Sequence, residues 1–526
     1  MKTKRLYATL ISLIVALGGF LLGFDSAVIS GATPFYKISF ALDTGSWLIG
    51  FSVGSIILGA IIGNIIAGPI ADRFGRKKVL ITTSILFTYA ALGTALAHNI
   101  TFFIVARLIG GLGVGMAILV APMYIAEIAP RNLRGRLVTF NQLNIVLGIS
   151  IAYFSNYFIQ AGITDPEMNW RWMLGVGVIP AILYFILLFL VPHSPRWLAQ
   201  KGRDEEALDV LTKVNEKEEA KKVFDEIKLS IKKDQQKDKT IDKTGYREVF
   251  SKKMKIVLII GFGIAFFQQI TGINAIFYYA PMIFEMSGVG KDSAFMQAII
   301  IGLTNVIMTL VAMSLIDKLG RKPLLIIGSI GITLSLALVG SAFSRAEYSI
   351  DQQAIESIQS EVSELGLIEE AALTTALVPM KDQVYTKETA FFSDLKANIG
   401  TLAYNTHKEL ILKHSITIGS IWVLIGLILF VASFAISLGP VMWALLSEIF
   451  PNNVRGLAIS IVGFWNSIVS FSVATVFPME LENLGSGPTY FIFALFGFLT
   501  LLFVLRFVPE TKGKSLEELE SMLVGK

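Results

Sequence analysis

Two ionisable residues, Asp25 and Arg107, lie inside long apolar stretches of this 526-residue sequence. A charged side chain in the hydrocarbon interior of a membrane costs about 3 kcal/mol, so it usually has a partner and a function. Arg107 keeps its charge at physiological pH, whereas the carboxyl group of Asp25 can gain and lose a proton. If the two groups approach in one conformation and separate in another, proton binding at Asp25 is coupled to a conformational change. A static buried ion pair is the alternative.

Uncharged hydrogen-bonding side chains gather in another apolar stretch, FFQQITGINAIFYYAP at residues 266–281. A carboxamide such as Gln268, Gln269 or Asn274 offers donors and an acceptor, which suits the hydroxyl groups of a sugar, while aromatic rings suit its C–H face. Gly272 permits a break in the helix, so residues on both sides of it can face one cavity. Hydrogen bonds between helices are the alternative role for such amides.

The composition places these residues in a membrane protein. The chain is 54% hydrophobic and 16% charged, with a mean hydropathy of +0.65. Twelve apolar runs are each long enough to cross roughly 30 Å of hydrocarbon. They begin near Leu6, Ser46, Val79, Phe102, Leu137, Met173, Ile256, Ala294, Leu324, Ile416, Leu457 and Tyr490. We therefore predict an all-α membrane protein with twelve transmembrane helices, in which the first helix continues past Gly31 toward Pro34 so that Asp25 and Arg107 reach matching depths.

Charge and motif content exclude other classes. The sequence has no cysteine and four histidines, so disulfides and thiolate metal sites are excluded and a metal centre is not expected. It contains no H-E-x-x-H or G-x-S-x-G motif, so we do not expect an enzyme. Lysine and arginine cluster in alternate connections, which predicts that both termini lie in the cytoplasm. We expect a multi-pass protein of the plasma membrane.

An internal repeat divides the chain. DRFGRKK at residues 72–78 recurs as DKLGRK at 317–322, and AEIAPRNLRGR at 126–136 recurs as SEIFPNNVRG at 447–456. The two offsets, 245 and 321 residues, differ because the second half carries an insertion. We predict an N-terminal six-helix bundle over 1–192, a cytoplasmic linker over 193–255, a C-terminal six-helix bundle over 256–508 with an external insertion over 345–413, and a cytoplasmic tail over 509–526. The linker contains either short amphipathic helices or solvated chain, and the role of the insertion is open.

Eight motifs in order resemble those of the sugar porter family of the major facilitator superfamily. They are DRFGRKK, RLIGGLGVG, PMYIAEIAPRNLRGRL, PHSPRWL, QQITGINAIFYYAP, DKLGRKP, GPVMWALLSEIFPNNVRG and PETKGKSLEELE. The resemblance implies the major facilitator fold and import of a monosaccharide, a pentose or hexose, with a proton by alternating access. It implies membrane lipid around the protein, no nucleic-acid partner and no cofactor besides the coupling proton. A facilitative uniporter and a non-transporting sugar sensor are the alternatives.

The resemblance also carries residue roles. It implies sugar contacts at Gln142, Gln268, Gln269, Asn274, Asn305, Trp443 and Asn466. It implies aromatic lining nearby at Phe434 and Tyr279. Proton symporters of the family resemble this chain at Asp25 and Arg107. Gly439 and Pro440 predict a break in the tenth span that could act as a hinge. His193 departs from the family, which usually has glutamate there.

Charged residues repeat in the predicted cytoplasmic connections. Glu127 precedes Arg134 by seven residues across a proline, and Glu448 precedes Arg455 in the same way, which suggests pairing. The resemblance implies a network that latches the two halves on the cytoplasmic side while the cavity faces outward, formed by Asp72, Arg76, Glu127, Arg134, Asp317, Arg321, Glu448 and Arg455. Partly exposed ion pairs contribute about 1 kcal/mol or less, which suits a switch. A purely topological role for the basic residues is the alternative.

Overall fold

The computed structural model describes residues 2–43, 46–130, 133–237, 247–364, 370–451, 454–514 and 516–523. Within those ranges, twelve helical segments are long and apolar enough to cross a membrane, so the predicted number of spans is confirmed. In the first half they are α1 (Lys2–Ser39), α2 (Trp47–Phe74), α3 (Arg76–Ala95), α4 (Ile100–Ile128), α5 (Arg134–Gly162) and α6 with α7 (Pro166–Gly175 and Val178–Leu188). In the second half they are α12 with α13 (Lys255–Ile270 and Ile273–Met286), α14 (Lys291–Leu319), α15 (Arg321–Ser344), α19 with α20 (Ser420–Ile436 and Leu438–Ile449), α21 (Arg455–Leu484) and α22 (Ser486–Phe507).

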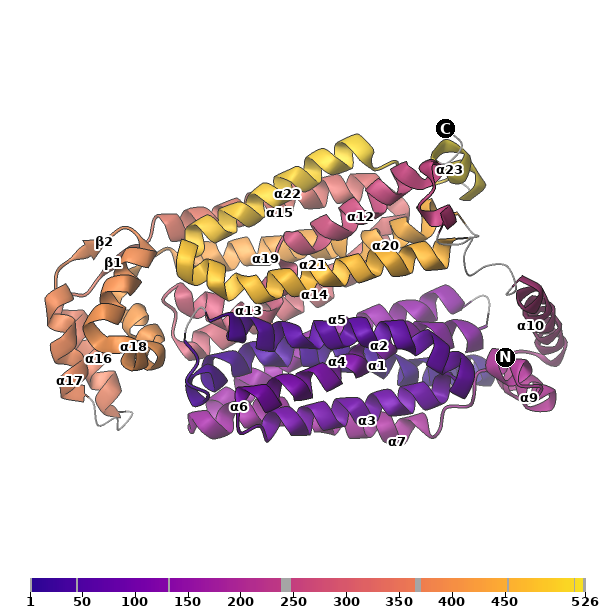
Figure 1. Ribbon diagram of the computed structural model, residues 1–526, viewed down its shortest axis with the longest axis horizontal. Helices are drawn as coiled ribbons and strands as arrows, with labels where there is room; N and C mark the ends of the chain where they lie inside the picture. Colours follow the sequence, from indigo (N-terminus) through magenta and orange to yellow (C-terminus); the bar gives the residue numbers. More distant parts are fainter. Residues whose placement is uncertain are drawn as a thin grey trace.

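Each half is a bundle of long helices, with the first half below the second in Figure 1. In the first half α1 packs along α5 and α2 along α4, and in the second half α15 packs along α22 and α19. Glycines allow the closest approach between α2 and α4: a Cβ atom on Gly111 would lie 2.3 Å from the carbonyl oxygen of Ile56, and one on Gly115 would lie 2.0 Å from that of Ala60. Small residues at such crossings are typical of membrane helices.

Three of the spans are broken into two helices. The seventh breaks at Thr271 and Gly272, where Gly272 adopts a φ of +90°, and this confirms the predicted break. The tenth breaks at Ser437, two residues before the predicted Gly439. The difference arises because Pro440 lacks an N–H group and fits the first turn of a helix, so the interruption falls before it.

Short helices gather at the end of the bundles that carries both chain termini (Figure 1), which we call the termini end. They are α8 (Pro195–Gln200), α9 (Asp204–Val214), α10 (Lys217–Lys237), the 3₁₀ helix η1 (Lys252–Met254) and α23 (Leu516–Leu523). In α9 the side chains of Ala207, Leu211 and Val214 are buried, as their helical spacing requires. The part of the linker that the structure describes thus contains amphipathic helices, the first of the two alternatives.

The insertion forms a folded unit at the opposite end, which we call the insertion end (Figure 1). Its elements are β1 (Glu347–Ser349), α16 (Gln352–Glu364), α17 (Glu370–Leu377), the 3₁₀ helix η2 (Val378–Met380), β2 (Val384–Tyr385) and α18 (Glu388–Ser415), followed by β3 (Ile416–Thr417). The three strands pair antiparallel in the order β2-β1-β3. Tyr348 stacks on Phe391 with ring centroids 5.3 Å apart, so the unit has a small core of its own.

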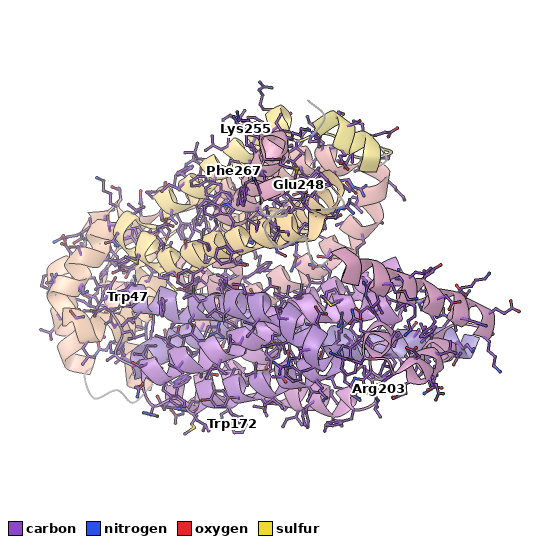
Figure 2. The ribbon with its side chains drawn as sticks, turned by 45° about the vertical axis from the view of Figure 1, so that its right-hand side comes forward. Trp47, Trp172, Arg203, Glu248, Lys255 and Phe267 are labelled. Atoms are coloured by element: carbon purple, nitrogen blue, oxygen red, sulfur yellow. The ribbon has the colours of Figure 1, made fainter. Side chains whose placement is uncertain are left out.

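Exposed aromatic side chains mark the insertion end of the first half. Trp47 is 54% exposed and Trp172 is 59% exposed, and Figure 2 places both toward that end, with Arg203 near the other. Tryptophan is enriched where a membrane span meets water, so this level is consistent with a membrane interface.

The two halves meet near the insertion end. A Cβ atom on Gly50 would lie 1.8 Å from the carbonyl oxygen of Thr475, which joins the beginning of α2 to the last third of α21. The hydroxyl of Tyr153 on α5 donates to the carbonyl oxygen of Phe277 on α13 at 2.7 Å. Tyr153 also lies against Gly302 of α14. These close contacts hold the two halves together at that end.

Candidate functional site

Four of the predicted sugar-contacting amides form one hydrogen-bonded group, which we call the amide cluster: Gln268, Gln269, Asn274 and Asn466. Asn274 Nδ2 donates to Gln269 Oε1 at 2.8 Å and to Ser470 Oγ at 2.6 Å. Gln269 Nε2 donates to Asn466 Oδ1 at 3.1 Å, and Asn466 Nδ2 donates to Gln268 Oε1 at 3.0 Å. Because the amides satisfy one another, an incoming hydroxyl ligand would exchange these bonds for its own, and its net gain would be a fraction of each gross bond energy.

Two helix breaks position the amide cluster. Gln268 Nε2 donates to the carbonyl oxygen of Leu438 at 2.9 Å, at the start of α20. Asn466 Nδ2 donates to the carbonyl oxygen of Ala265 at 2.9 Å. Gly272 separates Gln269 on α12 from Asn274 on α13, so the break it makes lets both amides enter the same group. The cluster therefore connects α12, α13, α20 and α21, all in the second half.

The remaining predicted sugar-contacting residues lie outside that hydrogen-bonded group. Gln142 is exposed on α5, and Trp443 is 45% exposed on α20. Asn305 is buried on α14, and Phe434 is half-buried on α19. Tyr279 is fully buried, and its hydroxyl donates to the carbonyl oxygen of Ala474 at 3.0 Å. The role of all nine residues in sugar binding stays a prediction.

Asp25 and Arg107 form an ion pair between α1 and α4. Arg107 Nη1 lies 3.3 Å from Asp25 Oδ2, and Arg107 Nη2 donates to the carbonyl oxygen of Val53 at 3.3 Å. The side chain of Arg107 is 1% exposed and that of Asp25 is 20% exposed. Arg107 Nε has no hydrogen-bond partner among the described residues. The carboxylate is thus partly exposed, whereas the guanidinium is buried and both of its contacts are 3.3 Å long.

Tyr278, which the sequence did not single out, connects the ion pair with the amide cluster. It is buried on α13, it faces Ser26 of α1, and it interacts electrostatically with both Arg107 and Asp25. Asn274 stands four residues earlier on the same short helix, and residues at this spacing share one helix face. The sequence signal was available, because Tyr278 and Asn274 belong to the same motif.

At the termini end, two charge clusters occupy repeat-related positions. In the first half Arg76, at the start of α3, lies 3.0 Å from Glu127 of α4 and 3.1 Å from Asp72 of α2. In the second half Arg321, at the start of α15, lies 2.7 Å from Glu448 of α20. Each cluster lies within one half of the molecule.

The structure differs here from the predicted pairing of each glutamate with the arginine seven residues later. Arg134 is exposed, and Arg455 Nε donates to the carbonyl oxygen of Phe450 at 3.0 Å. The reason is geometric: the chain reverses between α4 and α5 and between α20 and α21, so a helix from earlier in each half supplies the partner instead. The side chain of Asp317 lies outside the described residues. A latch between the halves stays a prediction for a conformation closed at the termini end.

Two hydroxyl groups complete the charge clusters and were not predicted. Ser194 donates to Glu127, and Thr511 donates to Glu448 at 2.5 Å. They occupy equivalent places in VPHSPRW and VPETKGK, the segments that close the two halves. Aligning the two segments residue by residue would have found both hydroxyls.

The same alignment exposes an asymmetry between the halves. Glu510 accepts hydrogen bonds from the backbone N–H groups of Arg321 at 3.1 Å and Lys322 at 3.0 Å, and so caps α15. His193 occupies the equivalent position in the first half, near the N-terminus of α3. Its Nδ1 has no hydrogen-bond partner among the described residues, and its ring stacks on Trp197 with centroids 5.1 Å apart. An imidazole at this position therefore replaces the carboxylate that caps α15 in the second half.

Comparisons with known proteins agree over nearly the whole chain. The family model described as "Sugar (and other) transporter" matches residues 11–357 and 396–523. The arabinose-proton symporter of Bacillus subtilis is 35% identical over 523 residues, which cover 98% of this chain and 95% of that protein. The glucose transport protein of Synechocystis is 36% identical over 523 residues, covering 98% and 97%. The inward open conformation of the xylose transporter XylE from E. coli superposes with a TM-score of 0.73 at 33% identity, covering 98% of this chain and 99% of that one.

Proposed function

This chain belongs to the sugar porter family of the major facilitator superfamily, and we propose that it imports a monosaccharide together with a proton by alternating access. The relatives support the substrate class, since two carry the names of a pentose and one that of a hexose. The name of the arabinose-proton symporter also supports coupling to a proton.

The observation that carries the proposal is the placement of α13 between the two candidate sites. Asn274 belongs to the amide cluster, and Tyr278 faces Ser26 and interacts electrostatically with Asp25 and Arg107. Gly272, with its positive φ, gives α13 a hinge at its beginning. A change in the hydrogen bonds of Asn274 when a sugar binds would therefore reach the ion pair through one short, hinged helix.

The proton step follows from the chemistry of the ion pair. Asp25 accepts a proton, which removes its charge and the attraction of Arg107 for it. Arg107 stays charged, and because it is almost fully buried it needs another acceptor when Asp25 is neutral. Breaking a buried pair costs about 3–5 kcal/mol when one charge is left without a partner. That energy is sufficient to favour a different packing of α1 against α4.

Three observations support an inward-facing state for this structure. The contacts between the halves lie near the insertion end, and the residues of the tenth span include the half-exposed Trp443. The solved structure with the TM-score of 0.73 is the inward open one. We propose that the termini end is cytoplasmic and the insertion end external, in agreement with the distribution of basic residues.

Counterflow and accumulation in proteoliposomes test the proposal. Purified protein is assayed for exchange with labelled xylose, arabinose, glucose and galactose, and for accumulation driven by an inward pH gradient. Asp25→Asn should retain exchange and lose accumulation. Glu480→Gln, a half-buried carboxylate at the insertion end of α21, is the matched control and should behave as wild type.

Each result decides between mechanisms. Accumulation by Asp25→Asn at the wild-type level would contradict the role of Asp25. Exchange without any accumulation in wild type would identify a facilitative uniporter instead, and binding without exchange would identify a sugar sensor.

A further inference from the structure

The insertion carries a region that the family model does not include. The model match stops at residue 357 and resumes at 396, so the end of α16, all of α17 and the start of α18 have no counterpart in it. These elements belong to a folded unit that also includes β1, β3 and Tyr348 from the matched residues on either side. This unit lies at the end where the two halves meet.

The insertion is fixed to the second half of the molecule. Lys408 on α18 lies 3.0 Å from Glu482 at the end of α21, and the hydroxyl of Tyr404 donates to the same carboxylate at 3.1 Å. Glu388, at the start of α18, accepts a hydrogen bond from the backbone N–H of Ser486 at 2.6 Å and so caps α22. The insertion therefore moves with the second half when the halves separate.

Helix α18 also contacts the first half of the molecule. Glu409 forms an ion pair with Lys37 in the last turn of α1. One turn earlier on α18, Asn405 Nδ2 donates to Asp43 Oδ1, in the loop after α1, at 3.3 Å. Lys37 is 4% exposed and Glu409 is 16% exposed, so this pair is much less screened by solvent than an ordinary surface pair.

Other charges surround the pair. Glu285, the next-to-last residue of α13, is 2% exposed, and neither of its carboxyl oxygens has a hydrogen-bond partner among the described residues. It interacts electrostatically with Glu409, Lys291 and Lys37. Burial, the largest single effect, raises the pKa of Glu409, but the charge and hydrogen bond of Lys37, together with the charges of Lys291 and Lys408, hold that pKa below its ordinary value. Glu409 is therefore ionised at neutral pH and attracts Lys37.

From these contacts we propose that Lys37 and Glu409 are gate residues of the transport cycle: the insertion, fixed to the second half, holds the end of α1 and keeps the insertion end shut while the termini end is open. The inference rests on the proposed alternating-access function, since a gate matters only if the two ends open in turn. The insertion end cannot open without breaking this pair, because its two members belong to parts that separate.

Removing one member of the pair should favour the open insertion end. Glu409→Gln keeps the shape of the side chain and leaves Lys37 buried without its counterion, which destabilises the closed form. We expect the population open at the insertion end to increase on the order of tenfold or more. Lys37→Met should act in the same direction. The double variant should shift the population by less than the sum of the two single shifts, because both act on one interaction.

The matched control lies on the same helix. Lys413 on α18, four residues after Glu409, lies 2.8 Å from Glu361 of α16, and both side chains are about one-third exposed. That pair is internal to the insertion, so Lys413→Met should leave the gate unchanged. A shift in Lys413→Met equal to that in Glu409→Gln would overturn the proposal.

Spin-label distances in the full-length protein measure the gate directly. The sequence contains no cysteine, so labels can be attached to introduced cysteines alone. Met168→Cys on α6 with Leu484→Cys at the end of α21 reports the separation of the halves, and both positions are nearly half exposed. Ala397→Cys on α18 with Leu484→Cys reports whether the insertion stays on the second half.

In Glu409→Gln, the distance between residues 168 and 484 should lengthen while that between 397 and 484 stays the same. No change in the first distance, or a change in the second, would overturn the proposal, since the second would mean that the insertion has merely detached. The distances need no transport activity. If the distances change as expected but wild type moves no sugar, the pair still holds the insertion end closed, while the proposed function is refuted.

Discussion

Replacing His193 with glutamate should supply the first half with the cap that Glu510 gives the second half. A carboxylate at position 193 should accept hydrogen bonds from the first backbone N–H groups of α3, as Glu510 does from those of α15. An anionic cap at a helix N-terminus contributes about 0.5–2 kcal/mol. Loss of the stacking between His193 and Trp197 costs about 0.5–1 kcal/mol. The net expectation is a stabilisation of about 0.5 kcal/mol.

The advantage of the glutamate should depend on pH. Burial lowers the pKa of His193, with smaller effects in the same direction from Lys77 and Arg203. The unfolded chain therefore binds a proton at His193 more readily than the folded one does. The stability that neutral His193 contributes is present above about pH 6.5 and is lost as the pH falls through the lower, folded-state pKa. Glutamate at this position stays ionised over that range, so the difference between variant and wild type should grow from pH 7.5 to pH 5.5.

Thermal unfolding of the full chain in detergent measures both effects. His193→Glu should raise the Tm by roughly 0.5 °C at pH 7.5, and by more at pH 5.5. Glu510→Gln, which weakens the existing cap, should lower it without the same pH dependence. An unchanged or lower Tm for His193→Glu at both pH values, with Glu510→Gln destabilised as expected, would refute the equivalence of the two positions.

Three further predictions concern transport. Gln269→Ala and Asn274→Ala should each weaken sugar binding, measured by calorimetry, by about 1–3 kcal/mol. The double variant should lose less than the sum of the two single losses, because the two side chains share a hydrogen bond. Normal sugar affinity in both single variants would show that neither residue belongs to the site. Glu448→Gln removes the charge that Arg321 contacts at 2.7 Å and should slow counterflow while sugar affinity stays unchanged. Counterflow at the wild-type rate would show that this charge cluster has no role in the transport cycle. Tyr153→Phe removes the hydrogen bond from α5 to a backbone carbonyl of α13 and should weaken closure of the insertion end by about 1 kcal/mol, seen as a longer distance between labels at positions 168 and 484.

Sequence reasoning was most successful where a property depends on local chemistry. The twelve apolar runs, the break at Gly272 and the amphipathic face of α9 depend on residues close together in the chain. The amides of FFQQITGINAIFYYAP were singled out for the same reason. Asn466 lies almost 200 residues later, and Gln269 donates to it. Only the family resemblance, and not the spacing of residues, placed Asn466 in the same predicted site.

Contacts between distant elements could not be derived in the same way. The partner of Glu127 is Arg76, because the direction of the helices decides which arginine reaches the carboxylate. The strands of the insertion have two or three residues each, too few to show an alternating pattern. The pair of Lys37 and Glu409 joins positions 372 residues apart in the chain, and no local signal links them.

The most direct test of the account is simultaneous measurement of proton and sugar movement. Proteoliposomes without an imposed gradient receive the sugar that gives the fastest counterflow, and the external pH is recorded. Wild type should take up protons along with the sugar, while Asp25→Asn should exchange sugar without moving protons. Sugar entry in wild type with no change in external pH would contradict proton coupling through Asp25 and Arg107.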